Sequence, residues 1–352
     1  MANKNQAVSI IGVGACTAIG VNAPMSAASV RAGISRISEH PYMIDKTGEP
    51  MIIAMASYLP EDIEYIERIV ELGLSAVNEA LSPLNELKIN GEIPLIVGLP
   101  PKRPGVVDSV ELEITDKIGG NEKFGFSEIE TIPCGHSAGL IAVEKGCRKI
   151  AKGEAEFCLA GGADSYMSPM LLEFLDFEEQ LHSEANKYGF TPGEAASFCL
   201  LASEKTAEKY NLDVRAKIMS VANAKEENLI KTDTVCVGEG LTKTIKNVLN
   251  PIADTGKKIN QTVCDLNGER YRTDEYGFTL SRTGEFFVKP DDIITPADCW
   301  GDTGAASGPL FISLAVRAGL RGYAKGHLTL VWTSSESGER SAALIQCRDK
   351  TE

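Results

Sequence analysis

The chain has 352 residues, of which 43% are apolar and 24% are charged, a composition typical of folded globular proteins. Asp and Glu outnumber Lys and Arg by 49 to 35, so the net charge is −14. This balance argues against binding to nucleic acid or to an anionic membrane, since both require a cationic face. No apolar run approaches the roughly 20 residues that span a bilayer. The polar start Met1–Gln6 predicts no signal peptide, so we expect a cytoplasmic protein.

Short β-branched runs alternate with helical runs along the first half of the chain. Strands are predicted at Ala7–Ile19, Met51–Tyr58, Ile93–Leu99, Ser127–Cys134, Glu156–Ala160 and Ala195–Ala202. Helices are predicted at Pro24–Arg31, Glu61–Leu81 and Ser137–Lys152. This alternation is typical of parallel strands joined by crossover helices.

The same pattern then begins again. Strands are predicted at Lys217–Ala224, Gln261–Leu266, His327–Thr333 and Ser341–Cys347, with helices at Leu241–Leu249 and Ala306–Leu320. The sequence therefore predicts two αβ halves of similar layout, 1–203 and 204–352. No linker rich in Pro, Gly or Ser separates them, so we expect one compact body.

Nine cysteines, an odd number, are spread along the chain without a Cys-x-x-Cys pair. The spacing argues against a zinc ribbon and against a dithiol redox motif. Cys158 and Cys199 stand in apolar runs, where a free cysteine behaves as a small hydrophobic residue. We expect reduced thiols and neither a metal nor a cofactor.

The segment Cys134-Gly135-His136-Ser137 falls where a predicted strand ends and a helix begins. A helix N-terminus carries partial positive charge and unpaired N–H groups. That field lowers the pKa of a thiol and favours the neutral form of a histidine. The segment is equally compatible with a helix cap and with a functional site.

Four segments carry a resemblance to a known family: Val8–Ala18, Gly153–Asp164, Gly189–Ala196 and Gly301–Gly308. In order and spacing they resemble the β-ketoacyl-acyl-carrier-protein synthases of the thiolase superfamily over nearly the whole chain. The resemblance implies an α/β thiolase fold, five-layered αβαβα, built from two duplicated βαβαβ-type halves. Members of the family are usually dimers.

The resemblance also locates the family's catalytic positions in this chain. Family members use a cysteine nucleophile and two histidines. Here those positions correspond to His136, Asn267 and Asp302, and Cys134 lies two residues before the nucleophile position. The resemblance implies that these three side chains converge, as the matching family residues do. The resemblance therefore implies a degenerate synthase in which no catalytic residue is expected.

Three alternatives remain at these positions. His136 and Asp302 are a general-base pairing if they meet, as in an acyl hydrolase or decarboxylase. Cys134 is an alternative nucleophile for a surviving acyltransferase. Five side chains are also candidate metal ligands, namely Cys134, His136, Cys264, Cys299 and Asp302. We favour a hydrogen-bonded polar remnant that keeps the fold.

Superfamily precedents imply a role in binding. Some ketosynthase-like subunits lack the nucleophile and assist an active subunit, and some thiolase-like proteins accompany type VI secretion effectors as adaptors. The stretch before His136 is shorter than is usual in the family, where this region supplies much of the dimer contact. The resemblance therefore does not decide whether this chain is a monomer or a dimer. An acidic acyl carrier protein is a poor partner for so acidic a chain. We predict a protein-binding adaptor or accessory factor, with Glu173–Glu179 and Glu269–Ser281 as candidate contact segments.

Overall fold

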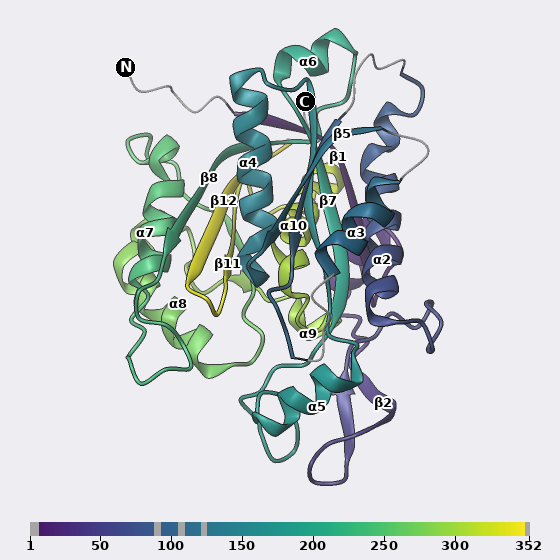
Figure 1. Ribbon diagram of the computed structural model, residues 1–352. Coiled ribbons are helices and arrows are strands. Elements are labelled where there is room, and N and C mark those ends of the chain that lie inside the picture. The colour runs from purple at the N-terminus through teal and green to yellow at the C-terminus, as the bar shows by residue number, and fades with distance from the viewer. Residues whose placement is uncertain (1–6, 88–92, 105–109, 121–124, 349–352) are drawn as a thin grey trace.

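The computed structural model describes residues 7–87, 93–104, 110–120 and 125–348 (Figure 1). The strands are β1 (Val8–Thr17), β2 (Ser38–Ile44), β3 (Pro50–Ile53), β4 (Ile93–Leu99), β5 (Phe126–Pro133), β6 (Phe157–Ser165), β7 (Glu194–Ala202), β8 (Ala216–Lys225), β9 (Gln261–Cys264), β10 (Ile293–Ile294), β11 (Leu328–Ser334) and β12 (Glu339–Cys347). The helices are α1 (Ala23–Arg31), α2 (Tyr65–Leu81), α3 (Val110–Gly119), α4 (Ala138–Lys152), α5 (Pro169–Phe177), α6 (Glu204–Lys209), α7 (Glu239–Val248), α8 (Arg270–Thr283), α9 (Ala297–Trp300) and α10 (Ser307–Arg321).

The order of the strands shows the predicted duplication. Hydrogen bonds join ten strands in the order β10-β9-β11-β12-β8-β1-β7-β6-β4-β5. The order β1-β7-β6-β4-β5 in one half thus corresponds to β8-β12-β11-β9-β10 in the other. The halves meet where β1 and β8 pair antiparallel over three residues on each strand.

The prediction of parallel strands is wrong at one strand in each half. β7 runs antiparallel to β6 and β1, and β12 runs antiparallel to β11 and β8. An antiparallel neighbour needs no crossover helix, and four residues, 335–338, suffice to join β11 to β12.

The helices form three layers around the two halves of the sheet (Figure 1). α4 and α10 lie between the halves, and their side chains, such as Leu140 and Leu310, share a core with Val331. α2 and α3 cover one outer face, and α7 and α8 cover the other. The fold is therefore the five-layered αβαβα architecture that the resemblance implied.

The sequence did not predict β2, α3 or α8, and two predicted segments have other bounds in the structure. The strand predicted at Met51–Tyr58 ends at Ile53, and the following helix begins only at Tyr65. β6 does not end at its paired glycines but continues to Ser165. A Cβ at Gly162 would lie 2.2 Å from the carbonyl oxygen of Ala305, so glycine here permits close packing against the turn before α10. Within the described residues, no helix is both long enough and apolar enough to span a membrane.

Candidate functional site

Three positions singled out from the sequence meet where α4 and α10 begin. His136 lies in the short 3-10 turn before α4, Asp302 lies just before the corresponding turn of α10, and Asn267 follows β9. The chain turns at Gly135 and Gly301 with φ of 76° and 74°, in the left-handed region that favours glycine. The expected convergence of the three side chains is confirmed.

Asp302 is the centre of this cluster. Both of its carboxylate oxygens lie 2.9 Å from Nε2 of His136. Nδ2 of Asn267 donates to it at 2.6 Å, and the backbone N–H of Gly304 donates at 2.8 Å. Because a carboxylate only accepts hydrogen bonds, Nε2 of His136 carries its hydrogen toward Asp302.

The charge of Asp302 is strongly stabilised. Burial by itself raises the pKa of this carboxyl, but the attraction and hydrogen bond of His136 and the charge of Arg272 outweigh burial. The pKa of Asp302 therefore lies well below its usual range. A fixed anion therefore stands where the resemblance implies a family histidine position.

Arg272 is a member of the site that sequence reasoning missed. Its guanidinium donates to Glu269 and to Asp265 at 3.0 Å each, and its Nη2 lies 3.3 Å from Nε2 of His136. Lys231 adds a second cation 3.2 Å from Glu269. The cluster is thus a buried ionic network.

This network occupies one face of the segment Glu269–Ser281, which the sequence predicted as a contact segment. The segment forms most of α8, and Arg272, Glu275, Tyr276 and Thr279 are buried on one face of it. These residues lie three or four apart, which is the spacing of one buried face of a helix. The sequence did not reveal this face because most of its side chains are polar.

Cys134 does not have the lowered thiol pKa that is expected of a nucleophile at a helix start. Burial, aided by the negative charge of Glu339, raises the pKa of its thiol to about 12. The predicted lowering by the helix field is therefore wrong, since desolvation dominates. At neutral pH Cys134 is a protonated thiol, which is a poor nucleophile.

A cavity of about 320 Å³ reaches the residues 134–136. Leu171 and Leu175 of α5 form part of its apolar wall, and Glu336 stands among its polar residues. Arg103 also borders the cavity, but its charge is paired with Asp164 at 3.0 Å. The site is thus accessible to a small group, which is what an enzyme requires.

The five side chains considered as metal ligands do not gather into a metal site. In the part of the chain that the structure describes, a group of three His, Cys, Asp or Glu ligands within 4.8 Å of one another occurs elsewhere, at Glu226, Cys236 and Glu275. Cys264 instead lies 3.9 Å from the carbonyl oxygen of Ile294. Asp302 is occupied by the donors described above.

Comparison with known proteins places this geometry in a family context. Residues 131–207 match the family model described as Beta-ketoacyl synthase, N-terminal domain. None of the curated proteins matches the sequence. Among solved structures, the complex AntDE:AntF, a type II PKS acyl-carrier protein with its ketosynthase, is similar with a TM-score of 0.79 and 15% identity, over 97% of this chain and 99% of that one.

Two further structures agree. The ishigamide ketosynthase/chain length factor has a TM-score of 0.80 at 14% identity, over 97% of this chain and 99% of that one. The ketosynthase from module 6 of the bacillaene synthase of Bacillus subtilis 168 has a TM-score of 0.78 at 14% identity, over 98% of this chain and 73% of that one. The chain therefore has the same fold as these ketosynthases over nearly its whole length. The match to the family model covers residues 131–207.

Proposed function

We propose that this chain is a ketosynthase-like protein without condensing activity that acts by binding a protein partner. The observation that carries the proposal is the pairing of His136 with Asp302. The resemblance implies that these residues stand at the family's nucleophile position and at one of its histidine positions. The degenerate positions His136, Asn267 and Asp302 then form a structural remnant with no catalytic residue.

The chemistry of condensation supports this proposal. A cysteine holds the acyl group as a thioester, whereas an acyl-imidazole on His136 would hydrolyse far more readily. The developing oxyanion needs donors, but Asp302 is an anion. Two unit charges about 4 Å apart at an effective dielectric of 20 repel each other by about 4 kcal/mol.

The partner that we propose is an effector or a related accessory protein, including an effector loaded for type VI secretion. We also propose that the halves 1–203 and 204–352 act as one unit in this binding. Since acyl carrier proteins are acidic, the net charge of −14 disfavours that class of partner. The similarity to a ketosynthase/chain length factor also supports an active ketosynthase as partner. β5 lies at the edge of the sheet in the described chain, where a second chain can add a strand.

Affinity purification from the native cells tests the proposal, using the tagged wild type, His136→Ala, and Glu285→Ala as a control at an exposed position. Mass spectrometry identifies co-purified proteins and any covalent adduct. We expect the same partner with all three proteins and no acyl adduct. Loss of the partner with His136→Ala alone, or an acyl group bound to the wild type, would contradict the proposal.

A second candidate function is an acyl-processing enzyme, such as a hydrolase, decarboxylase or acyltransferase. The cavity that reaches His136 favours it, and a histidine oriented by a carboxylate is a general-base arrangement. It predicts turnover of acyl thioesters by the purified wild type and at least a 100-fold loss in His136→Ala and Asp302→Asn. Turnover that persists in both variants would exclude this pair as the base.

A further inference from the structure

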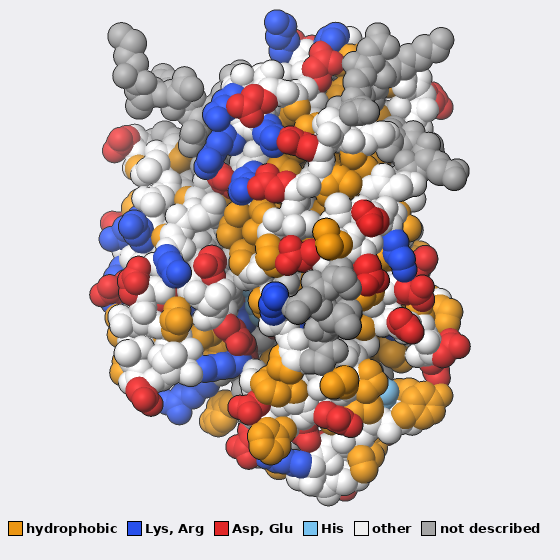
Figure 2. Space-filling view, viewed as in Figure 1, with side chains coloured by type: hydrophobic (Ala, Val, Ile, Leu, Met, Phe, Trp, Pro, Cys, Tyr) orange, Lys and Arg blue, Asp and Glu red, His pale blue; other side chains and the backbone are white. Residues whose placement is uncertain are grey.

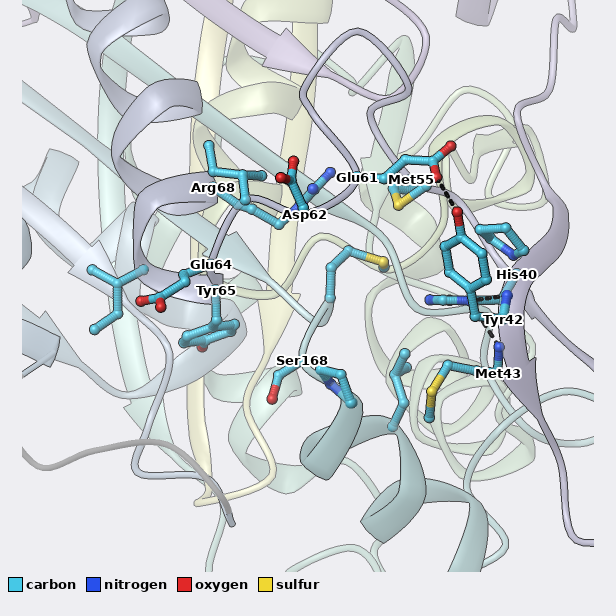
Figure 3. A pocket seen from close by; sticks show the side chains of 16 residues that line it. His40, Tyr42, Met43, Met55, Glu61, Asp62, Glu64, Tyr65, Arg68 and Ser168 are labelled. Carbon is cyan, nitrogen blue, oxygen red and sulfur yellow. Dashed lines mark hydrogen bonds between the residues drawn. The ribbon is translucent and has the colours of Figure 1, made fainter.

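A second cavity lies on the other side of α5 and shares no lining residue with the cavity at His136. It has a volume of about 510 Å³ and lies between the hairpin β2–β3, the start of α2 and the start of α5 (Figure 3). Its apolar walls include Met43, Met55, Met167 and Leu172. We call it the hairpin groove.

The hairpin groove carries negative charge that is not compensated. Glu61, Asp62 and Glu64 line it and are exposed. Arg68 also lines it, but both oxygens of the buried Glu194 bind its guanidinium at 2.8 and 2.7 Å, which neutralises the charge. Within the described residues, no ion pair forms with Asp62 or Glu64.

His40 does not offset this charge. Its Nδ1 accepts hydrogen bonds from the backbone N–H groups of Tyr42 and Met43 at 3.1 and 3.0 Å (Figure 3). Burial and the nearby Arg68 lower the pKa of His40 below its ordinary value, so it is neutral at pH 7. Glu61 accepts a hydrogen bond from the hydroxyl of Tyr42 at 2.6 Å.

Exposed apolar side chains on the hairpin and α5 belong to the same end of the molecule. The exposed fractions are 75% for Tyr42, 62% for Ile44, 63% for Met170 and 77% for Phe177. Figure 2 shows apolar side chains gathered at the lower end, over α5 and β2, with acidic side chains among them. Exposed apolar patches of this kind mark interaction surfaces.

We propose that the hairpin groove binds a basic, amphipathic segment of a protein partner. An apolar side chain of the segment enters between the methionines, whose flexible thioethers adapt to different shapes. Lys or Arg side chains of the segment meet Glu61, Asp62 and Glu64. The same carboxylates repel an acidic carrier protein. This inference rests on the proposed protein-binding function and names the surface that performs it.

Fluorescence anisotropy with synthetic peptides tests the groove directly. The probe is a labelled 14-residue peptide with Leu at helical spacing and Lys at the other positions. One matched peptide has Glu in place of Lys, and another has Ser in place of Leu. We expect the Leu/Lys peptide to bind the full chain at least tenfold more tightly than either, and to weaken as salt rises. Equal binding of all three peptides would overturn the proposal.

Charge reversal locates the binding. The variant Glu61→Lys, Asp62→Lys, Glu64→Lys should weaken the Leu/Lys peptide about tenfold, since exposed charge pairs each contribute modestly. A matched control reverses three exposed acids in the second half, Asp254→Lys, Glu285→Lys and Asp291→Lys, with the same change in net charge. Circular dichroism checks that both variants fold. Equal weakening by both would indicate non-specific attraction and refute the site.

The same variants separate failure of the groove from failure of the proposed function. If the groove variant captures the native partner as well as wild type does, the groove is not the partner surface, although the protein-binding function stands. If wild type captures no partner and carries an acyl adduct, the proposed function itself fails. Dimers in size-exclusion chromatography that the Leu/Lys peptide dissociates would indicate a second copy as occupant and would also refute the proposal.

Discussion

Replacement of Asp302 by alanine distinguishes a structural network from an active site. Active-site residues are often held at a cost in stability, so their removal is neutral or stabilising. In a structural network, the same change leaves cations and donors without their partner. Asp302 is 4% exposed and accepts from His136, Asn267 and Gly304. We therefore expect Asp302→Ala to lower the free energy of unfolding.

The contacts set the size of this loss. Hydrogen bonds to a charged group contribute about 1.5–3 kcal/mol each before the cost of burying the charge is subtracted. Removal of one partner from a buried ion pair typically costs about 3–5 kcal/mol. We expect a loss in that range for Asp302→Ala and a smaller one for Asp302→Asn, because asparagine still accepts from the N–H of Gly304.

Urea unfolding of wild type, His136→Ala, Asp302→Ala and the double variant measures the coupling between the two side chains. Contacting residues of this kind show interaction energies of about 0.5–3 kcal/mol. The folded pKa of Asp302 is depressed, so its stabilisation is present above the unfolded pKa near 3.9 and is lost as pH falls toward the folded pKa. The gap between wild type and Asp302→Asn should narrow below about pH 4.

The result that would refute this reasoning is an unchanged or raised free energy of unfolding in Asp302→Ala at pH 7. The pair would then resemble a strained active site, and the acyl-processing enzyme would become the better hypothesis. A coupling energy near zero, with both single variants destabilised, would show that His136 and Asp302 stabilise the fold separately.

Alkylation of Cys134 by iodoacetamide should be slow at pH 7 and should accelerate about tenfold per pH unit up to pH 10, because burial raises the pKa of the thiol to about 12. Peptide mass spectrometry measures the alkylation rate, and a rate that reaches a plateau near pH 8 would contradict the raised pKa. Arg68→Met should cost about 3–5 kcal/mol in urea unfolding because it strands the buried Glu194, and adding Glu194→Leu should restore most of the loss. Gly162→Ala should lower stability by about 1–3 kcal/mol, since its Cβ would overlap a backbone oxygen, and no change would indicate that the helix shifts freely. His136→Cys alone should not confer malonyl decarboxylation or condensation in a carrier-protein assay, since the resemblance implies that Asn267 and Asp302 replace the family's two histidines. Measurable turnover would contradict that assignment.

The local pattern of the sequence was enough to predict most of the strands and helices of the sheet halves. β4 and the buried face of α2 follow directly from an apolar run and from apolar residues three or four apart. The resemblance to the synthases then identified His136, Asn267 and Asp302 as neighbours. These properties are accessible because periodicity and motif spacing are written along the chain.

Other properties depend on what packs against a residue, and only the tertiary structure decided them. Burial reversed the expected effect of the helix field on Cys134, because desolvation depends on residues that are distant in the sequence. Arg272 looked like part of a charged surface until α8 placed it between Asp265 and His136. The uncompensated acidity of the hairpin groove likewise arises because Glu194, far along the chain, takes the charge of Arg68.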